Sequence, residues 1–230
     1  MKYLEDYNWS TFRILSILVV SALILQILDA FLIVSPYSKS QIVGYSALNL
    51  LAVLLITHLG VFLATRADLP ILTRPNLFTT ALIGSGIAIF AVGLDFIAFD
   101  GAIVRKVNNI DGLTSRFALA YTAAVGEETL FRLFVLSLIV VVSKKYISNR
   151  ATLLISLILS AGIFALAHVD ISNLSLSNVL RAILLNGSAG LVFGWLFWRQ
   201  GLIAAMLAHF AADVVIYVLF PVYWRVTGVT

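Results

Sequence analysis

Several ionisable side chains lie inside apolar stretches of this sequence, where lipid or protein interior would surround them. A charged group at the centre of a bilayer costs about 2.5–3.5 kcal/mol on insertion scales, so ionisable residues at that depth are functional candidates by default. Carboxylates and imidazoles are also the groups that move protons in hydrolysis. The sequence therefore predicts a buried catalytic site, whose candidate residues are Glu127, Glu128, Arg132, His168, His209 and Asp213.

The first three candidates differ in how they can be neutralised. Glu128 and Arg132 are four residues apart, so on a helix they share a face and can pair. A structural role alone would account for that pair. Glu127 points about 100° away from Glu128 on a helix and has no partner in its own turn. We expect a group on another helix to stabilise Glu127, as suits a general base in a partly dry cavity.

Two of the three histidines lie in similar contexts. His168 follows Phe164 by four residues, and His209 precedes Asp213 by four, so the second pair shares a helix face. One histidine in an apolar helix is often a packing residue. Two histidines, an unpaired glutamate and an aspartate on three apolar segments favour chemistry instead. Three further ionisable residues are interpreted as helix-packing or cavity-lining groups: Asp29, Asp95 and His58.

The composition is that of an integral, multi-pass membrane protein. Of 230 residues, 61% are hydrophobic and 11% charged, with a mean hydropathy of +1.05, whereas soluble domains have roughly 25% charged residues. The net charge of +4 comes from Lys and Arg scattered between apolar runs, which excludes nucleic acid as a partner. Cysteine is absent, so disulfides, thiolate metal sites and cysteine catalysis are excluded.

Apolar runs long enough for membrane helices recur along the chain. They predict an all-α, polytopic transmembrane helical bundle of about seven membrane-spanning helices, forming a single domain over residues 1–230. The fifth and sixth runs are short for a bilayer span, and Pro221 is expected to end the seventh. The runs are Ile14 to Val34, Val43 to Thr65, Leu77 to Phe99, Phe117 to Val142, Leu153 to His168, Ala182 to Trp198 and Leu202 to about Phe220.

Three motifs on successive apolar segments resemble one known family. Residues 127–132 fit EExxxR, residues 164–168 fit FxxxH, and residues 209–213 fit HxxxN/D. Each motif alone is weak, but together and in this order they are specific. Residues 115–220 thus resemble the CAAX-protease and bacteriocin-processing family (CPBP, or Abi), which includes the type II CAAX prenyl endopeptidases.

The resemblance implies an intramembrane endopeptidase that depends on a glutamate. By analogy Glu127 would be the base that activates a water, and His168 would help to position it. His209 and Asp213 would bind the developing oxyanion or complete the site. The CAAX-protease branch resembles Asn at position 213, whereas an ionised Asp cannot donate a hydrogen bond, so Asp213 is expected to orient His209.

The implied substrate is a peptide or a membrane protein within the lipid bilayer. Length and composition are typical of a protein of a prokaryotic cell membrane. A prenylated CAAX tail, a leader peptide and a bacteriocin all remain open. We expect no cofactor, although a zinc ion on Glu127, His168 and His209 is a second alternative. His-Glu-x-x-His and Gly-x-Gly-Asp are both missing, which excludes two other kinds of membrane protease.

Two alternatives from other functional classes fit the same residues. Buried Glu and His also form proton relays in proton-coupled transporters. A non-catalytic bacteriocin-immunity membrane protein could keep the same fold. Neither an inverted repeat nor loss of the candidate residues is evident in the sequence, and we favour the protease.

Overall fold

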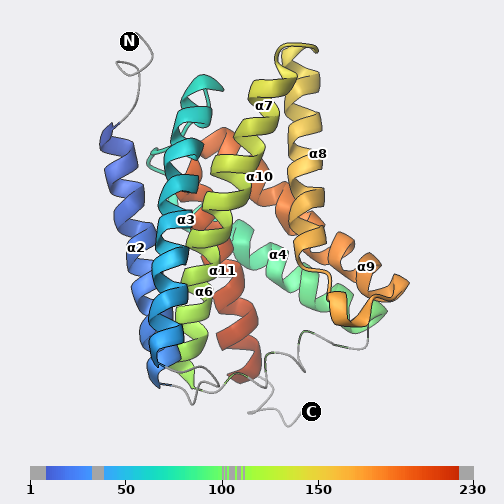
Figure 1. The fold of residues 1–230 in the computed structure, drawn as a ribbon. Coiled ribbons are helices and arrows are strands. Elements are labelled where there is room, and N and C mark those ends of the chain that lie inside the picture. Colours follow the sequence, from blue (N-terminus) through green and yellow to red (C-terminus); the bar gives the residue numbers. More distant parts are fainter. Residues whose placement is uncertain are drawn as a thin grey trace.

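The described part of the chain is all helical (Figure 1). The computed structural model describes residues 9–32, 39–99 and 112–222, together with Gly101, Ile103, Val107 and Ile110; of residues 29–32, 39–47 and 173 only the backbone is described. The elements are α2 (Trp9–Leu32), α3 (Lys39–Arg66), α4 (Leu77–Ala98), α6 (Leu113–Glu128), η1 (Thr129–Leu136), α7 (Ser137–Ser143), α8 (Asn149–Ala167), η2 (Ile171–Asn173), α9 (Leu176–Ala182), η3 (Ile183–Gly187), α10 (Ser188–Gln200), α11 (Leu202–Val214) and η4 (Val215–Leu219).

Six helical segments of the described residues are long and apolar enough to span a membrane. The fourth apolar run, which carries Glu127, Glu128 and Arg132, joins them as a helix that continues from α6 through η1 into α7. The prediction of an all-α polytopic bundle is confirmed. The six segments are Trp9–Leu28, Leu48–Arg66, Leu77–Ala98, Asn149–Ala167, Leu176–Gln200 and Leu202–Val222.

The prediction that the fifth and sixth runs are short was wrong. The structure has 19 residues in Asn149–Ala167 and 25 in Leu176–Gln200. Both helices begin earlier than the apolar pattern indicates, because their first turns contain polar residues that hydropathy does not count. Ser175 caps the sixth segment by accepting a hydrogen bond from the backbone N–H of Asn178. Pro221, expected to end the seventh helix, is itself helical, and the structure describes this helix as far as Val222.

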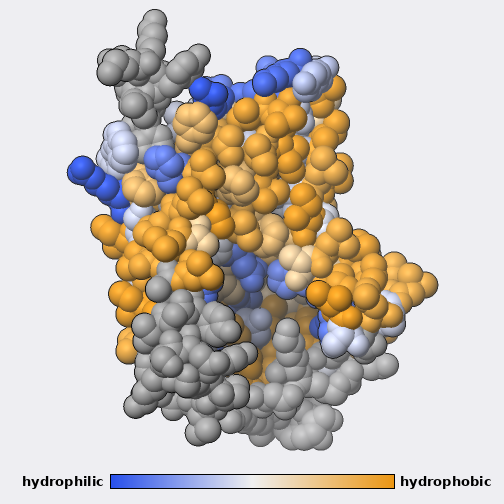
Figure 2. Space-filling model, in the orientation of Figure 1, coloured by the Kyte–Doolittle hydropathy of each residue, from blue (hydrophilic) through white to orange (hydrophobic). Residues whose placement is uncertain are grey.

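Apolar side chains cover most of the outer surface (Figure 2). On α3, Leu48, Leu51 and Leu55 are each more than half exposed, and on α4 Phe78 and Ile97 are exposed further still. Hydrophilic residues gather at one end of the molecule and in a hollow between these apolar surfaces. An exposed apolar surface of this extent fits contact with lipid.

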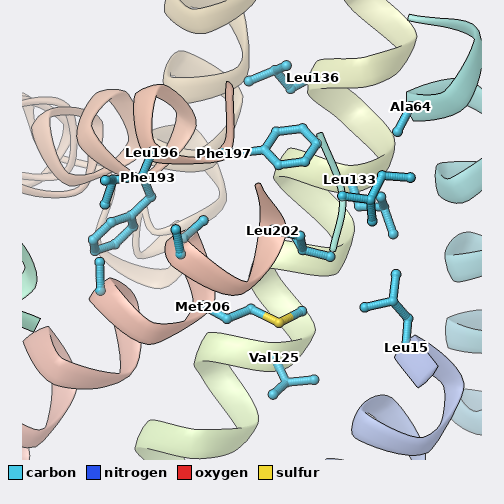
Figure 3. Packing of buried hydrophobic residues seen from close by; sticks show 14 of the residues in the cluster. Leu15, Ala64, Val125, Leu133, Leu136, Phe193, Leu196, Phe197, Leu202 and Met206 are labelled. Atoms are coloured by element: carbon cyan, nitrogen blue, oxygen red, sulfur yellow. The ribbon is translucent and has the colours of Figure 1, made fainter. Parts of the chain in front are cut away.

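The core is built around α11 (Figure 3). Leu202, Ala204, Ala205 and Ala208 of this helix are fully buried. Gly84 of α4 permits a close approach, since a Cβ there would lie 2.7 Å from the carbonyl carbon of Ala208. The face of α11 that contains these residues is therefore closely packed, and the same helix carries His209 and Asp213.

Three segments of the bundle are π-helical, and two of them adjoin candidate residues. The segment η1 follows Glu128 directly and contains Arg132, while η4 begins two residues after Asp213. π-Helical turns inside α-helices are frequently found at functional sites. In η1 the carbonyl oxygen of Phe131 accepts a hydrogen bond from Ser160 Oγ of α8 at 2.9 Å. This bond ties the helix of the glutamates to the helix that ends at His168.

Candidate active site

The six predicted site residues come from three parts of the bundle and meet in its interior. Glu127 and Glu128 end α6, and Arg132 follows in η1. His168 is the residue that caps the C-terminus of α8. His209 and Asp213 lie one turn apart on α11. The structure therefore brings all six into one cluster, although they are up to 86 positions apart in the sequence.

Glu128 is the buried centre of this cluster. Its side chain has no exposed surface, and its Oε1 lies 3.1 Å from Arg132 Nη1 and 2.8 Å from His209 Nδ1. Arg132, 1% exposed, also donates from Nη2 to the carbonyl oxygen of Gly190 at 3.3 Å. Its guanidinium lies 4.3 Å from the centre of the Phe164 ring. The predicted pairing of Glu128 with Arg132 is confirmed, and the bond to His209 extends it.

The ring of His209 is fixed by Glu128 on one side and by an aromatic ring on its face. Because a carboxylate oxygen accepts, Nδ1 of His209 donates to Glu128. Phe193 stacks on the imidazole with ring centres 4.7 Å apart. Nε2 then faces Asp213 Oδ2 at 3.6 Å and Glu127 Oε2 at 3.9 Å. The residue that orients His209 by a hydrogen bond is thus Glu128, where the sequence indicated Asp213.

Glu127 faces the second histidine across the helix interface. Its Oε2 lies 3.6 Å from His168 Nε2, and both side chains are 31% exposed. His168 Nδ1 donates to the carbonyl oxygen of Phe164 at 2.8 Å, so in the neutral ring Nε2 is the acceptor. Two acceptors at this separation leave a place for a water that donates to both. The predicted stabilising group on another helix is found in His168, with His209 beside it.

A cavity of about 160 Å³ lies beside the cluster, and four of the six residues line it. Glu127, His168, His209 and Asp213 line it, while Glu128 and Arg132 lie behind its wall. Apolar residues of α4 and of the end of the last helix complete the wall: Ile87, Ala88, Ala91 and Ile216. The arrangement can place a water and a peptide bond against carboxylate and imidazole groups with little bulk solvent.

Sequence reasoning missed three polar residues of this cavity: Arg181, Asn186 and Tyr217. They belong to no recognised motif, and in the sequence Arg181 is one of the Lys and Arg residues scattered between the apolar runs. Asp95, predicted to pack helices or line a cavity, is buried and paired with Arg181 at 2.6 Å. His58 contacts the rings of Trp9 and Phe12. The side chain of Asp29 lies outside the described residues.

Glu127 Oε2, His168 Nε2 and His209 Nε2 are the atoms that a zinc ion would use in this cluster. Zinc ligands stand about 2.0–2.2 Å from the metal. Within the described ranges of the chain, no three His, Asp or Glu side chains are grouped so that they could hold a metal ion. Two ligands at about 2.0–2.2 Å from one tetrahedral ion are about 3.4 Å apart, so the separations of 3.6 and 3.9 Å from the carboxylate to the two rings are compatible with a zinc ion as well as with a water.

The fold and the cluster define a multi-pass membrane protein with a buried carboxylate and imidazole site. Residues 110–215 match the family model described as "Type II CAAX prenyl endopeptidase Rce1-like". This segment contains all three motifs, and its match confirms the resemblance to that family, which is the CPBP/Abi family. The match supports an intramembrane endopeptidase, a class of enzyme that acts on a peptide or membrane protein. No curated protein and no solved structure gives a significant match.

Proposed function

We propose that this chain is a glutamate-dependent intramembrane endopeptidase in which Glu127 and His168 activate a water without a metal. One observation carries the proposal. Glu127 Oε2 and His168 Nε2 face each other across 3.6 Å at the wall of a cavity inside an apolar helical bundle. Both groups can accept a proton, so a water between them is directed to donate to both.

The first step is the attack of that water on the scissile carbonyl carbon. A carbon–oxygen bond forms while one water proton passes to Glu127 Oε2, the general base. His168 accepts a hydrogen bond from the second water hydrogen and keeps a lone pair of the water oxygen aimed at the carbonyl. The hydrogen bond from His168 Nδ1 to the carbonyl oxygen of Phe164 holds the ring in the tautomer that this role needs.

The second step is the collapse of the tetrahedral intermediate. In its imidazolium form, His209 donates from Nε2 to the oxyanion, as donors placed where charge develops do in other hydrolases. Glu128 and Arg132 hold this ring from behind the cavity wall. The carbon–nitrogen bond then breaks, and the proton on Glu127 passes to the departing amine. One water is consumed and Glu127 returns to its carboxylate form.

The substrate class follows from the surroundings of the site. Apolar side chains of α4 and η4 line the cavity, and the outer surface of the bundle is apolar. A peptide reaching the cavity from the bilayer, or an apolar tail of a membrane protein, matches these walls. A prenylated tail, a leader peptide and a bacteriocin all have this character. A prokaryotic cell membrane stays a prediction from length and composition.

The test is cleavage of a mixed peptide library by the purified full chain in detergent. The wild type, Glu127→Ala and His168→Ala are compared with and without a chelator. Asp68→Asn serves as the matched control, because Asp68 is 87% exposed, pairs with Lys144 and lies outside the cavity. Its φ of 57° is one that Asn also tolerates.

The expected result is cleavage by wild type and Asp68→Asn, insensitive to the chelator, and lost in both site variants. Loss on chelation with recovery on adding zinc would overturn the metal-free mechanism and make Glu127, His168 and His209 metal ligands. Cleavage by Glu127→Ala at the wild-type rate would contradict the assignment of the base.

A further inference from the structure

A second polar group lines the cavity apart from the six residues of the cluster. Arg181 of α9 and Asn186 of η3 both contribute to its wall, and neither belongs to a motif. The π-helical segment η3 starts two residues after Arg181 and includes Asn186. A π turn holds more residues than an α turn, so two residues five apart across it can face the same space.

Arg181 is held in place by a buried acid on α4. Its Nε donates to Asp95 Oδ1 at 2.6 Å, and Asp95 Oδ2 accepts from the backbone N–H of Ile103 at 2.7 Å. The Asp95 side chain is completely buried, whereas that of Arg181 is 24% exposed. Both oxygens of Asp95 accept hydrogen bonds, and the one to Arg181 holds the Nε edge of the guanidinium. The two NH₂ groups of the guanidinium do not bond to Asp95.

The remaining donors of Arg181 are available to a ligand in the cavity. A guanidinium has five N–H donors, and among the described residues only the Nε–H of Arg181 makes a hydrogen bond. The side-chain amide of Asn186 makes none within the same part of the chain. A guanidinium fork matches both oxygens of a carboxylate, and this pairing is stronger than a neutral hydrogen bond.

We propose that Arg181, assisted by Asn186, binds a carboxylate of the peptide substrate and so positions the peptide in the cavity that contains Glu127. The inference rests on the proposed function and adds to it a residue that determines specificity. The carboxylate is either the C-terminus of the peptide or an acidic side chain. Ile87, Ala88 and Ala91 of α4 line the same cavity and offer apolar contacts to the rest of the peptide.

The test measures binding, in the full-length Glu127→Gln protein, so that cleavage plays no part in it. The probes are three forms of one fluorescent apolar pentapeptide in detergent. The first has a free C-terminal carboxylate, the second has a C-terminal amide, and the third has the amide together with one internal Glu. We expect the first or the third to bind at least about tenfold more tightly than the second, since a charge-assisted pair readily supplies a tenfold change in affinity.

Two single substitutions separate carboxylate binding from a structural ion pair. Arg181→Gln is expected to abolish the preference for the carboxylate form. Asp95→Asn should retain it, because the guanidinium is still present. If the ion pair of Arg181 with Asp95 only stabilised the fold, Arg181→Gln and Asp95→Asn would change the preference for the carboxylate peptide to the same extent. Arg181→Gln leaves the buried carboxylate of Asp95 without its cation, which could itself disturb the fold. The double variant Asp95→Asn/Arg181→Gln removes both charges, so it tests the loss of the guanidinium without leaving an unpaired buried acid.

Three results would overturn the proposal: equal affinity for all three peptides, no binding of any of them, or loss of the preference in Asp95→Asn to the same extent as in Arg181→Gln. The outcome is separate from that of the cleavage test. A carboxylate preference that depends on Arg181 would stand even if Glu127 proved not to be the base, and the reverse also holds.

Discussion

One carboxylate oxygen of Glu128 contacts both Arg132 and His209, at 3.1 and 2.8 Å. The adjacent Glu127 faces the cavity instead. The helix turn therefore directs one of the neighbouring glutamates into the cavity and the other toward His209, behind the cavity wall. The two acids are expected to respond differently to the same substitution.

Glu127→Gln and Glu128→Gln should separate catalysis from stability. Both are expected to lower the rate of peptide cleavage by about 10²–10⁴-fold, the range for loss of a general base or of its supporting groups. Only Glu128→Gln should also lower the unfolding temperature, because Glu128 is fully buried and contacts two partners, whereas Glu127 is partly exposed. Cleavage assays and thermal unfolding in detergent check this. Equal unfolding temperatures for the two variants would contradict it.

Arg132→Met should destabilise the bundle strongly. It leaves the buried carboxylate of Glu128 without its cation, and breaking a buried pair costs about 3–5 kcal/mol. The double variant Glu128→Gln/Arg132→Met removes the unpaired charge and should recover part of that loss. Free energies of unfolding for the four proteins of this cycle are the measurement. Additive effects of the two substitutions would mean that the pair is not coupled.

Asp213→Asn should leave the enzyme active. Asp213 Oδ2 lies 3.6 Å from His209 Nε2 and is not the hydrogen-bond partner that fixes the ring. An amide of the same shape, able to donate toward the cavity, is expected to keep kcat within about tenfold, or about 1.4 kcal/mol of barrier. Asp213→Leu, which removes both polar atoms, should lower kcat further. If Asn were as damaging as Leu, the charge of Asp213 would be essential.

Gly84→Ala should impair both folding and cleavage, whereas Gly86→Ala should not. A Cβ at position 84 would overlap the backbone of Ala208, directly before His209, while a Cβ at position 86 meets no atom within 4 Å. Separating α4 from α11 would displace His209 from Glu128. In Gly86→Ala the helical propensity of Ala adds up to about 1 kcal/mol of stability. Unfolding temperature and cleavage rate of the two variants test the pair, and similar behaviour would refute the close approach.

The sequence predicted the apolar parts of the membrane helices but not the polar turns at which two of them begin. Long apolar runs revealed the membrane helices, but Asn149 and the capped start at Ser175 were missed, because polar first turns carry no hydropathy signal. The π-helical segments were also missed. Their hydrogen-bond pattern depends on how neighbouring helices pack, as the bond from Ser160 to Phe131 illustrates.

By itself, the sequence determined the apolar surroundings of this protein and the candidate residues of its site. The apolar composition predicted that lipid surrounds the chain. The four-residue spacings predicted that Glu128 lies beside Arg132 and His209 beside Asp213, because residues four apart share one face of a helix. Only the tertiary structure decided which residues meet between helices. It joined His209 to Glu128, set His168 opposite Glu127, and brought Arg181 with Asp95 to the same cavity. Such contacts depend on the approach and rotation of whole helices, which small residues such as Gly84 control, and no local spacing encodes them.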